Sequence, residues 1–134
     1  MKIDGACHCG YITMEGEADP QATTICHCTD CQTLTGSAFR VVVPAKRETF
    51  RLSGEPRIYV KTGESGRKRA QAFCSVCGTP IYSSDVKDPQ VFNLRVGAIR
   101  QRAELTPKMQ IWCRSALPWV MHLEPVAQIQ KQNF

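Results

Sequence analysis

Short stretches rich in β-branched and aromatic residues, separated by Gly and Pro, dominate the hydrophobic pattern of this chain. Such stretches favour β-strands, because these side chains suit an extended backbone that Gly and Pro interrupt. The pattern predicts strands over residues 38–43, 57–61, 70–73, 80–83, 91–96, 110–113 and 119–123. Helical periodicity is scarce, and we expect only a short helical turn over residues 29–34. The sequence therefore predicts a small, mostly β protein.

The length of 134 residues fits one domain with a modest core. We expect this domain to span residues 1–123 and to be followed by a Gln-rich tail, 124–134, that frays. No apolar run approaches the roughly 20 residues of a membrane-spanning helix, so no membrane span is expected. The sequence gives no indication of an oligomeric state.

Seven of the eight cysteines fall into three tight clusters: Cys7-x-Cys9, Cys26-x-Cys28-x-x-Cys31 and Cys74-x-x-Cys77. The first cluster begins only six residues after Met1, so we expect no signal peptide and a cytoplasmic location. In a reducing compartment, closely spaced cysteines bind metal more often than they form disulfides. The clusters therefore predict metal binding.

Two of these clusters suit one closed four-sulfur zinc site. A C-x-x-C turn directs two thiolates at one metal while backbone N–H groups bond to the sulfurs, and Gly78 suits the tight backbone after Cys77. Cys7 and Cys9 would share a face if their stretch is extended. The two pairs are therefore expected to combine into a structural site that links the N-terminus to the middle of the chain.

The middle cluster carries three sulfurs within six residues. Strand-like spacing from Cys26 to Cys28, followed by a turn to Cys31, can place all three around a second metal. Three protein ligands and one exchangeable ligand are typical of catalytic zinc. Alternatively, a protein group fills the fourth position and both sites are structural; the candidates are His8, His27, Asp30 and Cys113.

The formal net charge of +5 counts every cysteine as neutral. Seven metal-bound thiolates and two zinc ions would lower it by three, so nucleic-acid binding would need a concentrated basic patch. The basic loop 61–69 could contact the carboxylates of an acidic ligand or the phosphates of a nucleic acid, but a solvated turn is the simpler interpretation. A second basic run, with Arg95, Arg100 and Arg102, is equally open.

Taken together, the motifs resemble those of a known family. Gly5-Ala6-Cys7-His8-Cys9-Gly10, Cys26-His27-Cys28-Thr29-Asp30-Cys31 and Phe73-Cys74-Ser75-Val76-Cys77-Gly78-Thr79 are similar to the signature of the glutathione-dependent formaldehyde-activating enzymes, or S-(hydroxymethyl)glutathione synthases. That family includes the centromere protein V group. The resemblance spans about residues 5–120, and it implies a small β-tent fold related to the Mss4-like group.

The resemblance also implies roles for the cysteines. Cys7, Cys9, Cys74 and Cys77 match the ligands of a structural zinc, and Cys26, Cys28 and Cys31 match those of a catalytic zinc with an exchangeable fourth ligand. The implied activity is that of a carbon–sulfur lyase that adds glutathione's thiol to formaldehyde, or reverses this addition. The implied partner is a small thiol–aldehyde adduct rather than a nucleic acid. The centromere-associated relatives leave a non-catalytic zinc module for protein or nucleic-acid contacts as an alternative.

The residues could support this reaction in the following way. Zinc lowers the pKa of a bound thiol, and the resulting thiolate attacks the aldehyde carbon. Because zinc with three thiolates already carries a net charge of −1, delivery of a thiolate is favoured over strong carbonyl activation. His27 and Asp30 are the nearest groups in sequence for proton transfer. However, alternation along the chain favours His27 and His8 as exposed spacers that point away from the metal.

Cys113 is the cysteine outside the clusters, and we expect it to be a small buried apolar residue. A further alternative is a nucleophile like that of the B-type methionine sulfoxide reductases, but those enzymes hold zinc with two C-x-x-C pairs, which this chain lacks. Four aromatic residues could line a substrate cleft, but we expect most of them to pack in the core: Phe39, Tyr59, Trp112 and Trp119.

Overall fold

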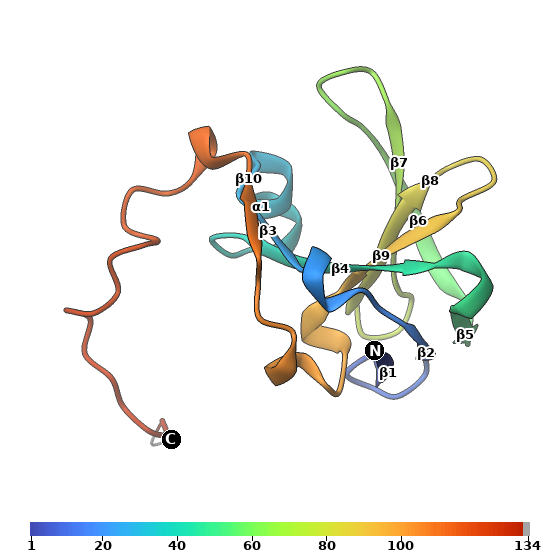
Figure 1. Cartoon of the computed structure of the whole chain (residues 1–134), viewed down its shortest axis with the longest axis horizontal. Helices are drawn as coiled ribbons and strands as arrows, with labels where there is room; N and C mark the ends of the chain where they lie inside the picture. The colour runs from blue at the N-terminus through green and yellow to red at the C-terminus, as the bar shows by residue number, and fades with distance from the viewer. Residues whose placement is uncertain (133–134) are drawn as a thin grey trace.

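The computed structural model describes residues 1–132, which form two β-sheets and one short α-helix (Figure 1). The smaller sheet has the strand order β1-β2-β5 and consists of β1 (Lys2–Ala6), β2 (Thr13–Glu17) and β5 (Arg51–Ser53). The larger sheet has the order β10-β3-β4-β9-β8-β7-β6. Its strands are β3 (Thr24–Cys26), β4 (Arg40–Lys46), β6 (Pro56–Thr62), β7 (Lys68–Cys74), β8 (Pro80–Asp85), β9 (Val91–Arg95) and β10 (Met109–Ile111). The mostly β prediction is confirmed.

Neighbouring strands of the larger sheet are antiparallel except for the edge pair β10 and β3, which are parallel. The helix α1 (Thr29–Thr35) follows β3 directly. Five 3₁₀ turns complete the fold: η1 (Pro20–Ala22), η2 (Arg47–Thr49), η3 (Val96–Ala98), η4 (Arg102–Glu104) and η5 (Cys113–Ser115).

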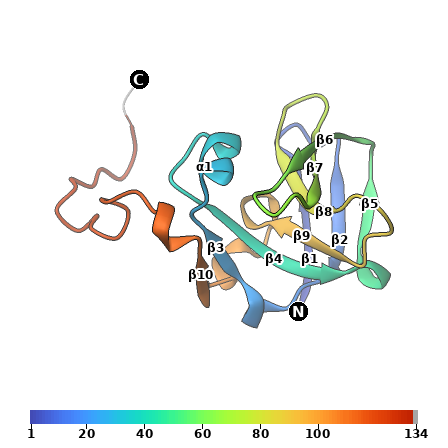
Figure 2. The same cartoon turned by 90° about the horizontal axis from the view of Figure 1, so that it is seen from above.

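The apolar core lies between the two sheets, as Figure 2 shows for β1 and β2 behind β4 and β9. Ile3 and Met14 of the smaller sheet belong to the same buried cluster as Val43 and Leu94 of the larger one. Because side chains alternate along a strand, the larger sheet turns a second row of residues away from this core. That second face carries the polar residues described below.

The predicted strands have counterparts in β4, β6, β7, β8, β9 and β10, with boundaries shifted by a few residues. The predicted strand 119–123 is wrong, because the chain there forms turns outside the sheets and Trp119, Met121 and Leu123 are exposed. Strands β1, β2, β3 and β5 were not predicted. Their sequences are short or mix Gly, charged and apolar residues, and they become strands through pairing with distant segments.

The predicted helical turn at 29–34 is confirmed by α1, which extends one residue further. After η5 the chain leads away from the sheets, and residues 121–132 are exposed and form neither helix nor strand (Figures 1 and 2). The last two residues of the predicted tail, 133–134, lie outside the described residues. Over residues 1–132, none of the helices has the length and apolar character needed to cross a membrane.

Candidate metal centres and the adjoining cavity

The sulfur atoms of Cys7, Cys9, Cys74 and Cys77 all lie within 4.8 Å of one another. The Sγ atoms of Cys7 and Cys9 are 3.6 Å apart, and those of Cys9 and Cys74 are 3.8 Å apart. Tetrahedral zinc with bonds of about 2.3 Å places its sulfur ligands about 3.8 Å from one another. This four-sulfur group therefore fits a tetrahedral metal ion, and it joins the end of β1 to the end of β7.

Two tight turns direct these sulfurs inward. The N–H groups of Val76 and Cys77 donate to Cys74 Sγ at 3.4 and 3.5 Å, as expected for a C-x-x-C turn, and Gly78 completes the turn with a φ of +81°. The expectation that Cys7 and Cys9 share an extended stretch is wrong. The chain turns after Cys7, the Gly10 N–H donates to the Cys7 carbonyl at 3.1 Å, and the Ile12 N–H donates to Cys7 Sγ at 3.2 Å.

The sulfur atoms of Cys26, Cys28 and Cys31 form the second group, again within 4.8 Å of one another. Cys26 ends β3, Cys28 caps the N-terminus of α1, and Cys31 lies in the first turn of that helix. Cys28 Sγ accepts a hydrogen bond of 3.3 Å from the Cys31 N–H. The local strand-then-turn geometry is as predicted, and the structure brings the seven clustered cysteines into the two groups expected from their spacing.

The three-sulfur group opens into a cavity of about 320 Å³ on the second face of the larger sheet. Its walls come from seven strands, and Cys26, Cys28 and Cys31 lie at one side. Four cationic side chains line it: Arg40, Lys61, Arg69 and Arg95. Within the described part of the chain, no aspartate or glutamate lines the cavity. Trp112 and Ile111 contribute apolar surface near the sulfurs.

Two of these cations are buried. Arg40 is 5% exposed and Arg95 is 8% exposed, and the Nε atom of each has no hydrogen-bond partner among the described residues. Arg95 Nη2 donates to Gln71 Oε1 at 2.5 Å. Burial, together with the nearby charge of Arg40, lowers the pKa of Arg95 to about 9, so the guanidinium remains charged at neutral pH. Arg40 was not among the candidate residues from the sequence, and Arg95 was named only as part of a basic run with Arg100 and Arg102.

A sequence signal for Arg95 does exist. Polar and apolar residues alternate in β9, and this alternation places Asn93 and Arg95 on the same face of the strand.

Without a bound metal, the thiols of the three-sulfur group differ in pKa. A hydrogen bond from Cys26 lowers the pKa of Cys31 to about 5, and Cys28 and the charge of Arg40 act in the same direction against the effect of burial. The neighbouring Cys31 sulfur and burial raise the pKa of Cys26 well above its ordinary value. The arrangement stabilises at least one thiolate at neutral pH, and a thiolate is the form that binds metal.

The two histidines considered for this site lie elsewhere. His27 does not line the cavity, but the expectation that it is an exposed spacer is wrong, since it is only 1% exposed. Its Nε2 lies 2.7 Å from Gln110 Oε1 on β10, and its ring packs edge-on against Phe39 at 5.7 Å. His8 is exposed, and its backbone N–H donates to Thr79 Oγ1 near the four-sulfur group. Neither imidazole joins a sulfur group among the described residues.

Asp30 lies outside the three-sulfur group and forms an ion pair of 2.9 Å with Lys61 Nζ. Both residues line a neighbouring cavity of about 440 Å³ that also borders Cys28 and Trp112. Lys61 belongs to both cavities, so this ion pair lies between them.

Cys113 is exposed at the start of η5 and lines neither cavity, so the expectation that it is buried is wrong. Trp112 follows the alternative given for the aromatic residues, a place in a cleft rather than in the core: it is 42% exposed and lines both cavities. It has a left-handed backbone with a φ of +56°, uncommon for a bulky residue and frequent at binding sites, and Arg114 stacks on its ring at 4.8 Å. Trp119 and Tyr59 are also exposed, whereas Phe39 is half-buried.

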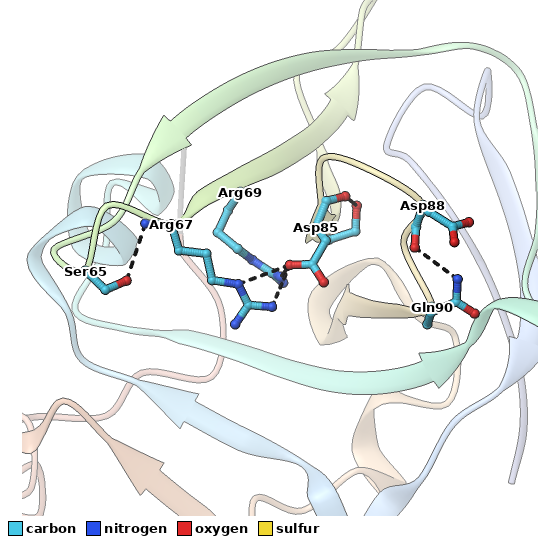
Figure 3. A network of polar contacts seen from close by, with 7 residues as sticks. Ser65, Arg67, Arg69, Asp85, Asp88 and Gln90 are labelled. Carbon is cyan, nitrogen blue, oxygen red and sulfur yellow. Dashed lines mark hydrogen bonds and ion pairs between the residues drawn. The ribbon is translucent and has the colours of Figure 1, made fainter.

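The basic loop is largely neutralised by the protein's own acids. Arg67 and Arg69 both point at Asp85, with contacts of 2.5 and 2.9 Å, as Figure 3 shows. These ion pairs lower the pKa of Asp85, the hydrogen bond from Arg67 being the largest cause. In the second basic run, Arg100 pairs with Asp4 at 2.8 Å and Arg102 donates to backbone carbonyls, so Arg95 alone of these three lines the cavity beside the three-sulfur group.

Comparisons with known proteins identify the fold and the family of this chain. A search of curated proteins found no match. Among solved structures, the fold is similar to the crystal structure of a Rhodobacter sphaeroides protein, with a TM-score of 0.60 and 18% sequence identity over 80% of this chain and 98% of that one. At this identity the likeness shows the fold. A family model described as glutathione-dependent formaldehyde-activating enzyme matches residues 2–115, which include all seven clustered cysteines. The chain therefore belongs to the glutathione-dependent formaldehyde-activating enzyme family.

Proposed function

We propose that this protein is a zinc-dependent carbon–sulfur lyase that adds a glutathione-like thiol to an aldehyde such as formaldehyde, or removes it. The observation that carries the proposal is the opening of the three-sulfur group into a cavity. A purely structural site would be closed by a fourth protein ligand, and among the described residues no fourth Cys, His, Asp or Glu joins Cys26, Cys28 and Cys31. Family membership supports the reaction class.

The donor sets support zinc as the metal. Sulfur-only ligands in tetrahedral or tripodal arrangements suit zinc, whereas magnesium and calcium prefer oxygen. Cys7, Cys9, Cys74 and Cys77 would hold a structural ion, and Cys26, Cys28 and Cys31 a second ion with one exchangeable position. When bound, this second ion would supply stabilisation of a substrate thiolate at neutral pH.

The reaction forms one carbon–sulfur bond. The substrate's sulfur attacks the carbonyl carbon, the carbon–oxygen π bond breaks, and the thiol's proton ends on the new hydroxyl oxygen. Lys61 Nζ, held by Asp30 between the two cavities, is the group we assign to donate a hydrogen bond to that oxygen. Trp112 provides an apolar wall beside the sulfurs that limits access of water. The buried contacts of His27 argue against a role in proton transfer.

Exchange spectroscopy of formaldehyde with glutathione tests the proposal. Zinc-loaded wild-type protein is expected to accelerate the exchange above the spontaneous rate, which must be subtracted. Cys28→Ser should reduce the exchange to the spontaneous rate, because it removes one of the three sulfurs while the four-sulfur group remains. Cys113→Ser is the matched control and should behave as wild type, since Cys113 lines neither cavity. A protein with two zincs and no acceleration would contradict this substrate assignment and favour a non-catalytic zinc module.

A further inference from the structure

We propose that Arg40 and Arg95 form an anion-binding subsite beside the three-sulfur group, and that it holds a carboxylate of the reacting thiol or carbonyl compound. The inference deepens the proposed function and rests on it for the identity of the reacting partners. Both arginines line the cavity that borders Cys26, Cys28 and Cys31.

The strand register places the two cations together at the sulfurs. Arg40 on β4 is paired with Cys26 on β3, and Arg95 on β9 is paired with Val42, two residues along β4. Residues two apart on a strand share a face, so both guanidinium groups are on the same side of the sheet as the cavity. An anion bound by them lies next to the three-sulfur group rather than at a distant surface.

The main argument is that both guanidinium groups are buried without a carboxylate partner, although Arg95 donates to Gln71 and Arg40 acts on the Cys31 sulfur. A buried guanidinium normally has its N–H groups satisfied and its charge paired, because an unpaired buried charge is strongly destabilising. Over residues 1–132, neither Arg40 nor Arg95 forms an ion pair with a carboxylate, and the buried Nε of each has no acceptor. Arg69 and Lys61, by contrast, are paired with Asp85 and Asp30. Among the cations of the lining, Arg40 and Arg95 are therefore the two that lack a carboxylate and keep an unpaired Nε donor.

Metal-bound cysteines do not balance this charge. Three thiolates around a divalent ion carry a net charge of −1, whereas the two guanidinium groups carry +2. One positive charge remains beside the sulfurs, and a second remains where Arg67 and Arg69 share the single carboxylate of Asp85. A substrate that supplies a thiolate to the metal and a carboxylate to the arginines would neutralise both. A carboxylate also matches the planar, forked donors of arginine, which a lone thiolate does not.

The size and composition of the cavity favour a compact acid. A volume of about 320 Å³ lies at the small end of ligand sites, and Ser83, Asn93 and Gln71 add polar groups to its lining. Formaldehyde itself carries no charge. The carboxylate must therefore come from the thiol, as in glutathione or a shorter thiol acid, or from an aldehyde that is itself an acid.

Calorimetric binding to the zinc-loaded full chain tests the proposal and separates the two sources. One arm compares mercaptoacetate with 2-mercaptoethanol, which differ in the carboxylate on the thiol. The other arm titrates 2-mercaptoethanol in the presence of glyoxylate or of glycolaldehyde, which differ in the carboxylate on the carbonyl compound. We expect the acid to bind about tenfold tighter or more in at least one arm, as for hydrogen bonds to a charged group.

In Arg95→Gln and, independently, in Arg40→Gln, this preference should fall to nearly one, while Arg95→Lys should keep part of it. Arg57→Gln is the matched control: it removes the same charge from an exposed position on β6 that borders neither cavity, and the preference should stay unchanged. Circular dichroism checks that each variant folds. If wild type shows no preference for the acid in either arm, or if Arg95→Gln and Arg40→Gln retain it, the proposal is overturned. Turnover is not measured, so a failure of the proposed lyase activity remains distinguishable.

Discussion

Both sulfur groups consist of cysteines, but the four-sulfur group connects distant segments of the chain and the three-sulfur group borders a cavity. The four-sulfur group joins segments almost seventy residues apart, and Cys9 and Cys77 are exposed although four sulfurs already suffice for a closed site. The three-sulfur group comes from six consecutive residues and faces a cavity lined by cations and Trp112. The comparison teaches that exposure of a cysteine does not identify a reactive site. The number of ligands and the surroundings of the remaining coordination position do.

The largest expected effect separates the two groups by stability. Cys74→Ser removes a ligand that links β7 to the N-terminal segment, and structural zinc sites contribute about 10–16 kcal/mol of apparent binding energy in peptides. We expect a loss on the order of 5 kcal/mol or more, which unfolds a domain of ordinary stability. Cys31→Ser removes a ligand within a local segment and should leave the fold intact. Thermal unfolding, followed by circular dichroism, measures the stability of both variants. Equal losses of stability would contradict the assignment of a structural role to the four-sulfur group alone.

The second expected effect concerns metal release. With a chelator in excess, zinc should leave in two phases, with the three-sulfur group losing its ion at least about tenfold faster, because an exchangeable position gives the chelator access. A colorimetric chelator follows the release, and Cys28→Ser identifies the fast phase by abolishing it. A single slow phase that accounts for two zincs per chain would mean that both groups are closed.

Two glycines, one near each sulfur group in the sequence, allow a comparison of the groups with a smaller expected effect. Gly78 after the four-sulfur turn and Gly36 at the end of α1 both have positive φ, +81° and +63°, and the space that a Cβ would occupy is open at each. Replacement by Ala therefore adds backbone strain of about 1–2 kcal/mol in each case, without a steric clash. Gly78→Ala should slow zinc uptake by the four-sulfur group, whereas Gly36→Ala should affect the three-sulfur group. Gly66→Ala, at a φ of +86° in the basic loop, is the control that strains the backbone away from both groups.

The smallest expected effect concerns the ion pair between Asp85 and Arg69, one of the cations that line the cavity. The ion pairs with Arg67 and Arg69 lower the pKa of Asp85 from 3.8, so they stabilise the fold above about pH 4 and are lost as the pH falls through the lowered pKa. Asp85→Asn should therefore lower the melting temperature slightly at pH 7 and low salt, where the carboxylate is ionised. Both pairs lie near the surface, so high salt should reduce this difference. An equal difference at low and at high salt would mean that the carboxylate acts by packing rather than by charge.

Sequence reasoning succeeded where the information is local. The Cys74–Cys77 turn and the run from Cys26 to Cys31 depend on neighbouring residues, so spacing was enough to predict their shape. It failed where distant segments decide. His27 is buried because β10, some eighty residues later, pairs beside β3, and Cys113 is exposed because the chain turns away from the sheet at Trp112. Strands β1 and β2 formed from unpromising sequences because they pair with each other over the core.

By itself, the sequence determined the mostly β character, the number of clustered sulfurs and their division into four and three. These follow from residue types and from spacings that the covalent chain enforces. Only the tertiary structure decided what the three sulfurs face. Arg40 and Arg95 are fifty-five residues apart, and the pairing of β4 with β9 places both beside Cys26 on one buried face. The charge of that cavity is therefore a property of strand register, which no local pattern specifies.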